Sequence, residues 1–113
     1  MPHCIIEYSN GVEHQATPEQ LIEKVQQGAN YSELFEPKHI KVRAISYQYS
    51  QTGIGDKGFV HVTAKILSGR TLSQRQMLSG KILETLQSMS LKELSITVEV
   101  VEMERDSYSK HVV

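Results

Sequence analysis

The chain has 113 residues, which is the size of a single domain and excludes a second one. Lysine and arginine number 12 against 13 aspartate and glutamate, so the formal net charge is -1 and bulk attraction to nucleic acid or anionic lipid is not expected. The single cysteine, Cys4, excludes an internal disulfide and a cysteine-based zinc cage. No apolar run reaches the roughly 18 residues of a membrane span, and the first residues lack a signal-peptide pattern, so we expect a cytoplasmic protein.

The first half of the chain predicts a strand, a helix and a second strand. Residues 2–8 are apolar and β-branched and are followed by the turn residues Ser9-Asn10-Gly11, as expected of a strand. The run Thr17-Pro18-Glu19-Gln20 has the pattern of a capping box and predicts the start of a helix that ends near residues 28–30. From Ile40 to about Tyr49, apolar and polar residues alternate, which predicts a strand with one basic face.

The second half repeats this order after a glycine-rich loop at Ser50–Gly58. The alternating stretch Phe59–Leu67 predicts a strand, and Thr71–Gln74 is a second capping box that opens a longer helix. Apolar residues recur every three or four positions in that helix, at Leu78, Ile82, Leu86 and Met89. Ile96, Val98 and Val100 mark a last strand, and the tail from about Asp106 has no strong pattern.

Strand, helix and strand therefore occur twice within one domain, 1–113, in halves of about residues 2–49 and 59–103. A duplicated β-α-β unit with right-handed crossovers predicts an α+β fold in which both helices cover one face of a four-stranded sheet. The opposite face would be polar, and if it is covered, the expected cover is another subunit. Its predicted members are His39, Lys41, Arg43, His61, Thr63, Lys65, Thr97 and Glu99.

Pro2 is the first candidate catalytic residue. A small second residue such as proline permits removal of the initiator Met1, which leaves a secondary amine at the edge of a strand. Burial and nearby cations both disfavour the charged form of an amine, so its pKa falls and it becomes a general base near neutral pH. The alternative is structural, because proline also blunts strand edges, and a retained Met1 would leave Pro2 with a peptide nitrogen.

Three cationic residues are candidates for binding a carboxylate. Lys41 and Arg43 share a strand face, and Arg70 immediately precedes a capped helix N-terminus, which favours an anion. Arginine forms a bidentate fork with a carboxylate, so Arg43 and Arg70 rank above Lys41. The alternative interpretation is a solvated charged strand face and a loop arginine.

Other chemistries find little support in the sequence. The five histidines show no metal-ligand spacing, and no metal site is expected. The loop with Gly53, Gly55 and Gly58 lacks the lysine and hydroxyl ending of a phosphate-binding loop. Cys4 lies within an apolar strand and is interpreted as a packing residue. Phe35 is a candidate wall of a substrate pocket.

The opening run Met1–Ser9, the stretch Ile40–Ala44 and the run Phe59–Leu72 resemble the 5-carboxymethyl-2-hydroxymuconate Δ-isomerase family of the tautomerase superfamily. The resemblance extends from Met1 to about Glu102 in the same order and spacing. It implies a homotrimer of duplicated β-α-β monomers with no metal or organic cofactor.

The resemblance also implies roles for individual residues. Pro2 would be the catalytic amine, and Arg43 and Arg70 would bind the carboxylate and keto oxygens of the substrate. Lys41 stands where this family's best-known members carry arginine, which preserves the charge but not the bidentate fork. The implied reaction moves a proton and a double bond in a 2-hydroxymuconate-like unsaturated dicarboxylate from aromatic catabolism.

Two other functions stay open from the sequence. One is a keto–enol tautomerase acting on phenylpyruvate-like acids, which needs a more aromatic pocket and less of a second carboxylate clamp. The other is a noncatalytic trimeric protein that only binds an anion, which retention of Met1 and the departure at Lys41 would favour.

Overall fold

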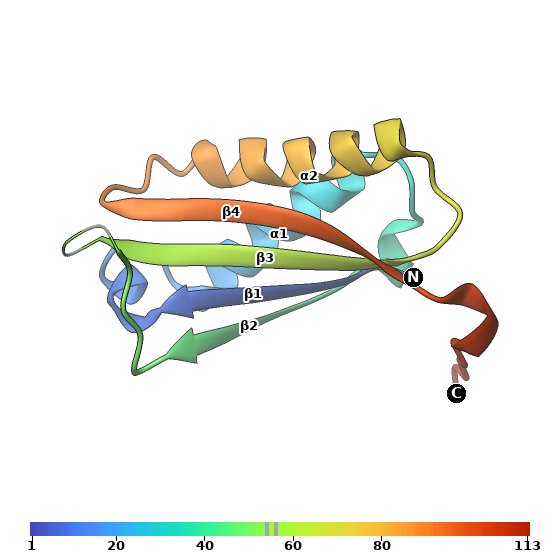
Figure 1. Ribbon diagram of the computed structural model, residues 1–113, viewed down its shortest axis with the longest axis horizontal. Helices are drawn as coiled ribbons and strands as arrows, with labels where there is room; N and C mark the ends of the chain where they lie inside the picture. The colour runs from blue at the N-terminus through green and yellow to red at the C-terminus, as the bar shows by residue number, and fades with distance from the viewer. Residues whose placement is uncertain (54, 56) are drawn as a thin grey trace.

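The computed structural model describes residues 1–53, 55 and 57–113. In these residues, a strand, a helix and a strand occur twice, in the order expected from the sequence (Figure 1). The strands are β1 (His3–Ser9), β2 (Lys41–Tyr47), β3 (Gly58–Leu67) and β4 (Leu94–Met103), and the α-helices are α1 (Pro18–Tyr31) and α2 (Leu72–Gln87). Short 3₁₀ turns lie at η1 (Asn10–His14), η2 (Pro37–His39) and η3 (Arg105–Ser107).

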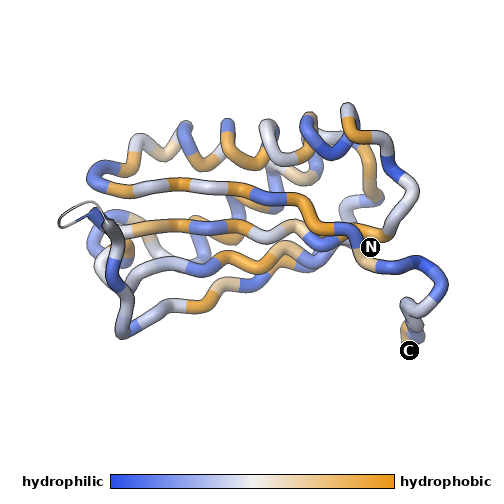
Figure 2. The backbone as a smooth tube through the Cα atoms, viewed as in Figure 1, coloured by the Kyte–Doolittle hydropathy of each residue, from blue (hydrophilic) through white to orange (hydrophobic). Residues whose placement is uncertain are grey.

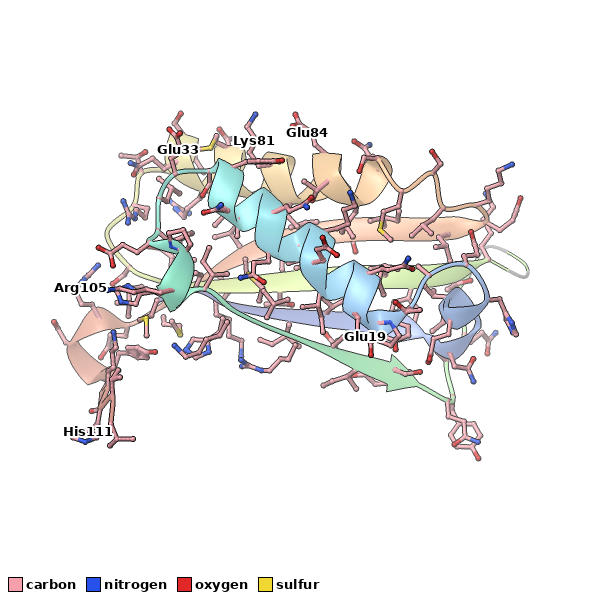
Figure 3. All side chains as sticks on the ribbon, turned by 180° about the vertical axis from the view of Figure 1, so that it is seen from behind. Glu19, Glu33, Lys81, Glu84, Arg105 and His111 are labelled. Carbon is pink, nitrogen blue, oxygen red and sulfur yellow. The ribbon has the colours of Figure 1, made fainter. Side chains whose placement is uncertain are left out.

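The four strands form one sheet in the order β2-β1-β3-β4. β1 pairs with β2 in parallel and β3 pairs with β4 in parallel, while the central pair β1 and β3 is antiparallel. Each parallel pair is joined through one helix, and both helices lie on the same face of the sheet, as the view from behind in Figure 3 shows. The predicted α+β architecture is confirmed.

Both helices begin at the predicted capping boxes. The Thr17 hydroxyl accepts a hydrogen bond from the Gln20 backbone N–H at 3.1 Å, and the Gln20 side chain accepts one from the Thr17 N–H at 2.9 Å. Thr71 and Gln74 repeat the same two bonds at the start of α2. These bonds satisfy N–H groups that have no partner within a helix, so they fix where each helix starts.

The core fills the layer between the helices and the sheet. Along β1 every second residue is buried, and Figure 2 shows the same alternation of hydropathy along the strands. Gly28 lets the helices pack closely, because a Cβ at this position would lie 2.6 Å from the Cα of Ile82 in α2. The largest fully buried side chains include Ile6, Leu21, Ile66, Leu78, Ile82 and Leu86.

The other face of the sheet, here called the open sheet face, carries the alternate residues of each strand. It mixes charge with exposed apolar groups, for example Ile45, which is 49% exposed, and Tyr47, which hydrogen bonds to Glu7. His61 lies 2.6 Å from both Thr97 Oγ1 and Glu99 Oε2. The residues of the open sheet face are His3, Ile5, Glu7, Lys41, Arg43, Ile45, Tyr47, Phe59, His61, Thr63, Lys65, Ser95, Thr97, Glu99 and Val101.

One predicted member of this face is placed elsewhere. His39 lies in η2 and not on a strand, because Pro37 starts a 3₁₀ turn and the N–H of Ile40 bonds back to the Pro37 carbonyl at 3.2 Å. The His39 ring instead lies 3.8 Å from the carboxylate of Glu36. The second strand consequently starts at Lys41 and ends at Tyr47, two residues before the predicted end.

Two smaller boundaries also differ from the prediction. Met89 lies beyond α2, which ends at Gln87, although its side chain still packs against the core. Gly58 belongs to β3 and not to the preceding loop, whose residues Ile54 and Asp56 lie outside the described residues. No helix in the described residues is long and apolar enough to cross a membrane.

Candidate active site

Four chain segments meet at one end of the strands, here called the N-terminal edge of the sheet. Most of the predicted site residues lie there. β1 and β2 begin at this edge, whereas β3 and β4 end at it, as the N-terminus and the departing tail in Figure 1 show. The Lys41 N–H donates to the Pro2 carbonyl at 3.1 Å, and the Ser68 N–H donates to the Met103 carbonyl at 2.9 Å. The topology therefore gathers residues that are distant in sequence.

The N-terminal end of the chain lies in a desolvated and electropositive setting. The Pro2 side chain is fully buried and Met1 is partly buried. The pKa of the Met1 amino group is lowered from 8.0, first by burial and then by repulsion from the positive side chains Lys110, Lys41, Arg70 and Arg105. An amine at this edge is thus driven toward its neutral, proton-accepting form.

Arg70 is held in place by two contacts. Its Nη2 donates a hydrogen bond to the Leu34 carbonyl at 2.6 Å, and its guanidinium carbon lies 5.6 Å from the centre of the Phe35 ring. Gly69 precedes it with φ of 124°, a backbone conformation that favours glycine. The turn after β3 therefore presents a fixed guanidinium beside an aromatic ring.

Arg43 and Lys41 lie on β2, next to the start of β1. Arg43 Nη1 lies 3.2 Å from His3 Nδ1, and His3 Nε2 lies 2.9 Å from the Tyr108 hydroxyl. The pKa of His3 is lowered, first by burial and then by Arg43, Lys41, the N-terminal amine and Lys65. A neutral His3 ring can accept from Arg43 at Nδ1 and donate to Tyr108 at Nε2, which fixes the tautomer. Lys41 Nζ lies 4.0 Å from the Met1 sulfur.

The structure thus brings Lys41 and Arg70 to the N-terminal edge, close to Pro2, and places Arg43 against His3. Sequence reasoning missed His3, Tyr108 and the tail cations Arg105 and Lys110. The alternation of β1 could have placed His3 on the same face as Arg43. Nothing in the tail sequence indicated that its cations approach the N-terminus.

Two hollows on the described surface are lined by other residues. One of about 400 Å³ is at the opposite end of the sheet, where β1 ends, and is lined by residues including Ser9, Gln15, Lys57 and Glu93. Another of about 270 Å³ lies beside α1. Neither includes Pro2 or a predicted substrate-binding residue. Among the described residues, no three His, Cys, Asp or Glu side chains are grouped as metal ligands.

The model of one protein family matches almost the whole chain. That family is described as 5-carboxymethyl-2-hydroxymuconate isomerase, and the match covers residues 2–112. The chain belongs to the 5-carboxymethyl-2-hydroxymuconate isomerase family. This confirms the resemblance seen in the sequence and makes the protein an isomerase. No curated protein matches this isomerase in sequence.

Solved structures with low sequence identity share the isomerase's fold. A 5-carboxymethyl-2-hydroxymuconate isomerase from Deinococcus radiodurans R1 is 20% identical with a TM-score of 0.81, and the match covers 97% of this chain and 88% of that one. A 5-carboxymethyl-2-hydroxymuconate delta-isomerase is 13% identical with a TM-score of 0.81, over 100% and 89% of the two chains. A fused 4-OT wild-type symmetric trimer is 10% identical with a TM-score of 0.76, over 96% and 90%.

Proposed function

We propose that the isomerase, once Met1 is removed, moves a proton and a double bond in a 2-hydroxymuconate-like unsaturated dicarboxylate, without a cofactor and with Pro2 as general base. The observation that carries the proposal is the full burial of Pro2 at the end of the sheet where Lys110, Lys41, Arg70 and Arg105 lower the pKa of the neighbouring Met1 amine. These cations favour a neutral amine, and they favour an anionic substrate beside it.

In the proposed reaction the Pro2 amine accepts a proton from the 2-hydroxyl group, or from a carbon next to the carbonyl. The electron pair of the broken bond forms a dienolate. The prolinium then returns the proton to a conjugated carbon, which shifts the double bond and restores the neutral amine. Every proton that leaves the substrate returns to it, so no external acid, oxidant or reductant is needed.

Arg70 and Arg43 have the proposed role of binding the substrate's carboxylate and keto oxygens. Charge builds on those oxygens as the dienolate forms, so fixed cations stabilise the transition state more than the ground state. Arg70 suits this task because its contacts to Leu34 and Phe35 hold it in place before substrate arrives. Lys41 contributes a positive charge close to Met1 without the bidentate geometry of arginine.

Comparison of Pro2→Ala with wild type tests the base assignment. Isomerisation is followed by ultraviolet absorbance, with mass spectrometry showing that Met1 is absent from each protein. We expect kcat to fall roughly 100-fold or more, the scale of a lost general base. Pro18→Ala, at the start of α1, is the matched control and should keep its turnover. Unchanged turnover in Pro2→Ala would show that Pro2 is not the base.

One structural feature favours a second substrate class. The Phe35 ring beside Arg70 would suit an aryl group next to a carboxylate, as in phenylpyruvate-like acids undergoing keto–enol tautomerisation. Comparing kcat/KM for phenylpyruvate and for a 2-hydroxymuconate separates the two enzymes. If Met1 is retained in cells and neither compound turns over, the chain is an anion-binding protein.

The open sheet face supports the further proposal of a homotrimer. Ile45 and Tyr47 leave apolar surface exposed on it, and a structural neighbour of the same fold is a symmetric trimer. Sedimentation at micromolar concentration should give three times the chain mass. Ile45→Lys should reduce the mass to that of the monomer, whereas Tyr31→Lys, on the helix side, should not. A monomeric wild type would contradict this assembly.

A further inference from the structure

The segment that follows β4 returns to the N-terminal edge and is part of the site's architecture. Met103 pairs with Leu67 at the ends of two parallel strands, so the segments that begin at Glu104 and at Ser68 leave the sheet side by side. In Figure 3, Arg105 is labelled where β4 leaves the sheet and His111 lies farther along the tail. This segment carries Arg105 and Lys110, two of the cations that act on the N-terminal amine.

Arg105 is anchored at its base with its outer end open. Its backbone N–H donates to the Ser68 hydroxyl at 3.3 Å, and its Nε–H donates to the Ser68 carbonyl at 3.1 Å. In the part of the chain that the structure describes, its two Nη groups have no hydrogen-bond or ion-pair partner. These two groups are the ends of the fork that binds a carboxylate in bidentate fashion.

Arg105 also lies against the turn that carries Arg70. Arg105 Nη2 would lie 3.7 Å from a Cβ placed on Gly69, the residue immediately before Arg70. The two guanidinium groups therefore lie at the same turn, but each is held by a different hydrogen-bond partner. Arg70 bonds to Leu34, and Arg105 bonds to Ser68. Two fixed guanidinium groups, one on this turn and one on the tail beside it, can each bind a separate carboxylate.

Tyr108 secures the tail in this position. Its hydroxyl lies 2.9 Å from His3 Nε2, and the two rings meet edge to face with centroids 6.2 Å apart. This contact joins the tail to the first residue of β1. The tail is thus attached on both sides of Asp106, through Arg105 to Ser68 just after β3 and through Tyr108 to β1.

We propose that Arg105 is a specificity-determining residue that binds the substrate carboxylate farther from the reacting atoms. This inference rests on the proposed function, since it assumes that Arg70 takes the nearer end of the same substrate. Cations fixed close together repel one another, and a dianion relieves that repulsion more than a monoanion does. Arg105 therefore selects dicarboxylates over monocarboxylates.

The test compares two ligands that differ in one carboxylate. Muconate and sorbate have the same six-carbon diene chain, but muconate has a carboxylate at both ends and sorbate at one. Binding of each to the processed protein is measured by calorimetry. In Arg105→Gln we expect muconate to bind about tenfold more weakly and sorbate to bind within about twofold of wild type. Lys92→Gln, an exposed cation at the opposite end of the sheet, should change neither.

Arg105→Lys keeps the charge without the fork and should recover only part of the loss, and it serves as the second variant if Arg105→Gln fails to fold. Equal loss for both ligands, no loss for muconate, or a wild type without preference for muconate would each overturn the inference. Ligand binding can be measured without turnover, so the proposed function and the proposed role of Arg105 can be contradicted independently of each other. Selective loss in a protein without isomerase activity would contradict only the proposed function, and an active enzyme with unaltered binding would contradict only the role of Arg105.

Discussion

Arg43 donates a hydrogen bond to His3 across the parallel pair β1 and β2, with Nη1 and Nδ1 3.2 Å apart. The bond requires a His3 ring that is unprotonated at Nδ1, so it links the position of a substrate-binding candidate to a titratable group. It also explains the second cause of the lowered pKa of His3. Burial is the larger cause, and the Arg43 guanidinium adds to it because it repels a positive charge on the ring.

This arrangement predicts a pH-dependent contribution of His3 to stability. The folded pKa lies below the unfolded value near 6.5, so the unfolded chain binds more protons and folding becomes less favourable as pH falls. The contribution is complete above the unfolded pKa and is lost as pH falls through the folded one. Urea unfolding of wild type and His3→Asn should show the largest stability advantage of wild type at pH 8, and a smaller one at pH 5. An advantage that is constant or grows toward acid would refute this.

Two helix glycines should respond to alanine in opposite directions. A Cβ on Gly28 would lie 2.6 Å from the Ile82 Cα and 2.9 Å from the Lys81 carbonyl oxygen, so Gly28→Ala forces α1 and α2 apart. We expect a loss of roughly 1–3 kcal/mol in the free energy of unfolding. Gly80 in α2 has no atom within 4 Å of such a Cβ, and Gly80→Ala should gain about 0.5–1 kcal/mol. Chemical denaturation measures both, and losses of equal size would show that the helices do not pack as described.

The thiol of Cys4 should be inert in the folded protein. Its side chain is fully buried in β1, and burial raises the pKa of the thiol to about 11, with a small opposing effect from Arg43. Little thiolate exists at pH 8, and thiolate is the form that reacts. Iodoacetamide should label the protein in concentrated urea but leave native protein unlabelled over the same period. Rapid labelling of the native protein would place Cys4 outside the core.

The fold could be predicted from the sequence because its signals are local. The capping boxes at Thr17 and Thr71 satisfy hydrogen bonds within four residues, and the alternation in β1 and β3 reflects burial of one sheet face. His39 was misplaced because the alternation of apolar and polar residues continues through Ile40, while the local effect of Pro37 ends it.

The site was predictable only in part. The shared face of Lys41 and Arg43 follows from the two-residue period of a strand. The approach of Arg105 to Ser68, 37 positions apart in the sequence, instead depends on the parallel pairing of β3 with β4 and leaves no local trace. Contacts that depend on strand order are visible only once the sheet is assembled.

The central claim is that the terminal nitrogen of the processed chain is desolvated and surrounded by cations, so that it acts as a base. The most direct test is a nitrogen-15 NMR titration of the Pro2 amine in protein that has lost Met1. Our account predicts a pKa below that of a proline amine in an unfolded peptide, by the same burial and the same cations that lower the pKa of the Met1 amine. A pKa equal to the unfolded value, or above it, would contradict the account.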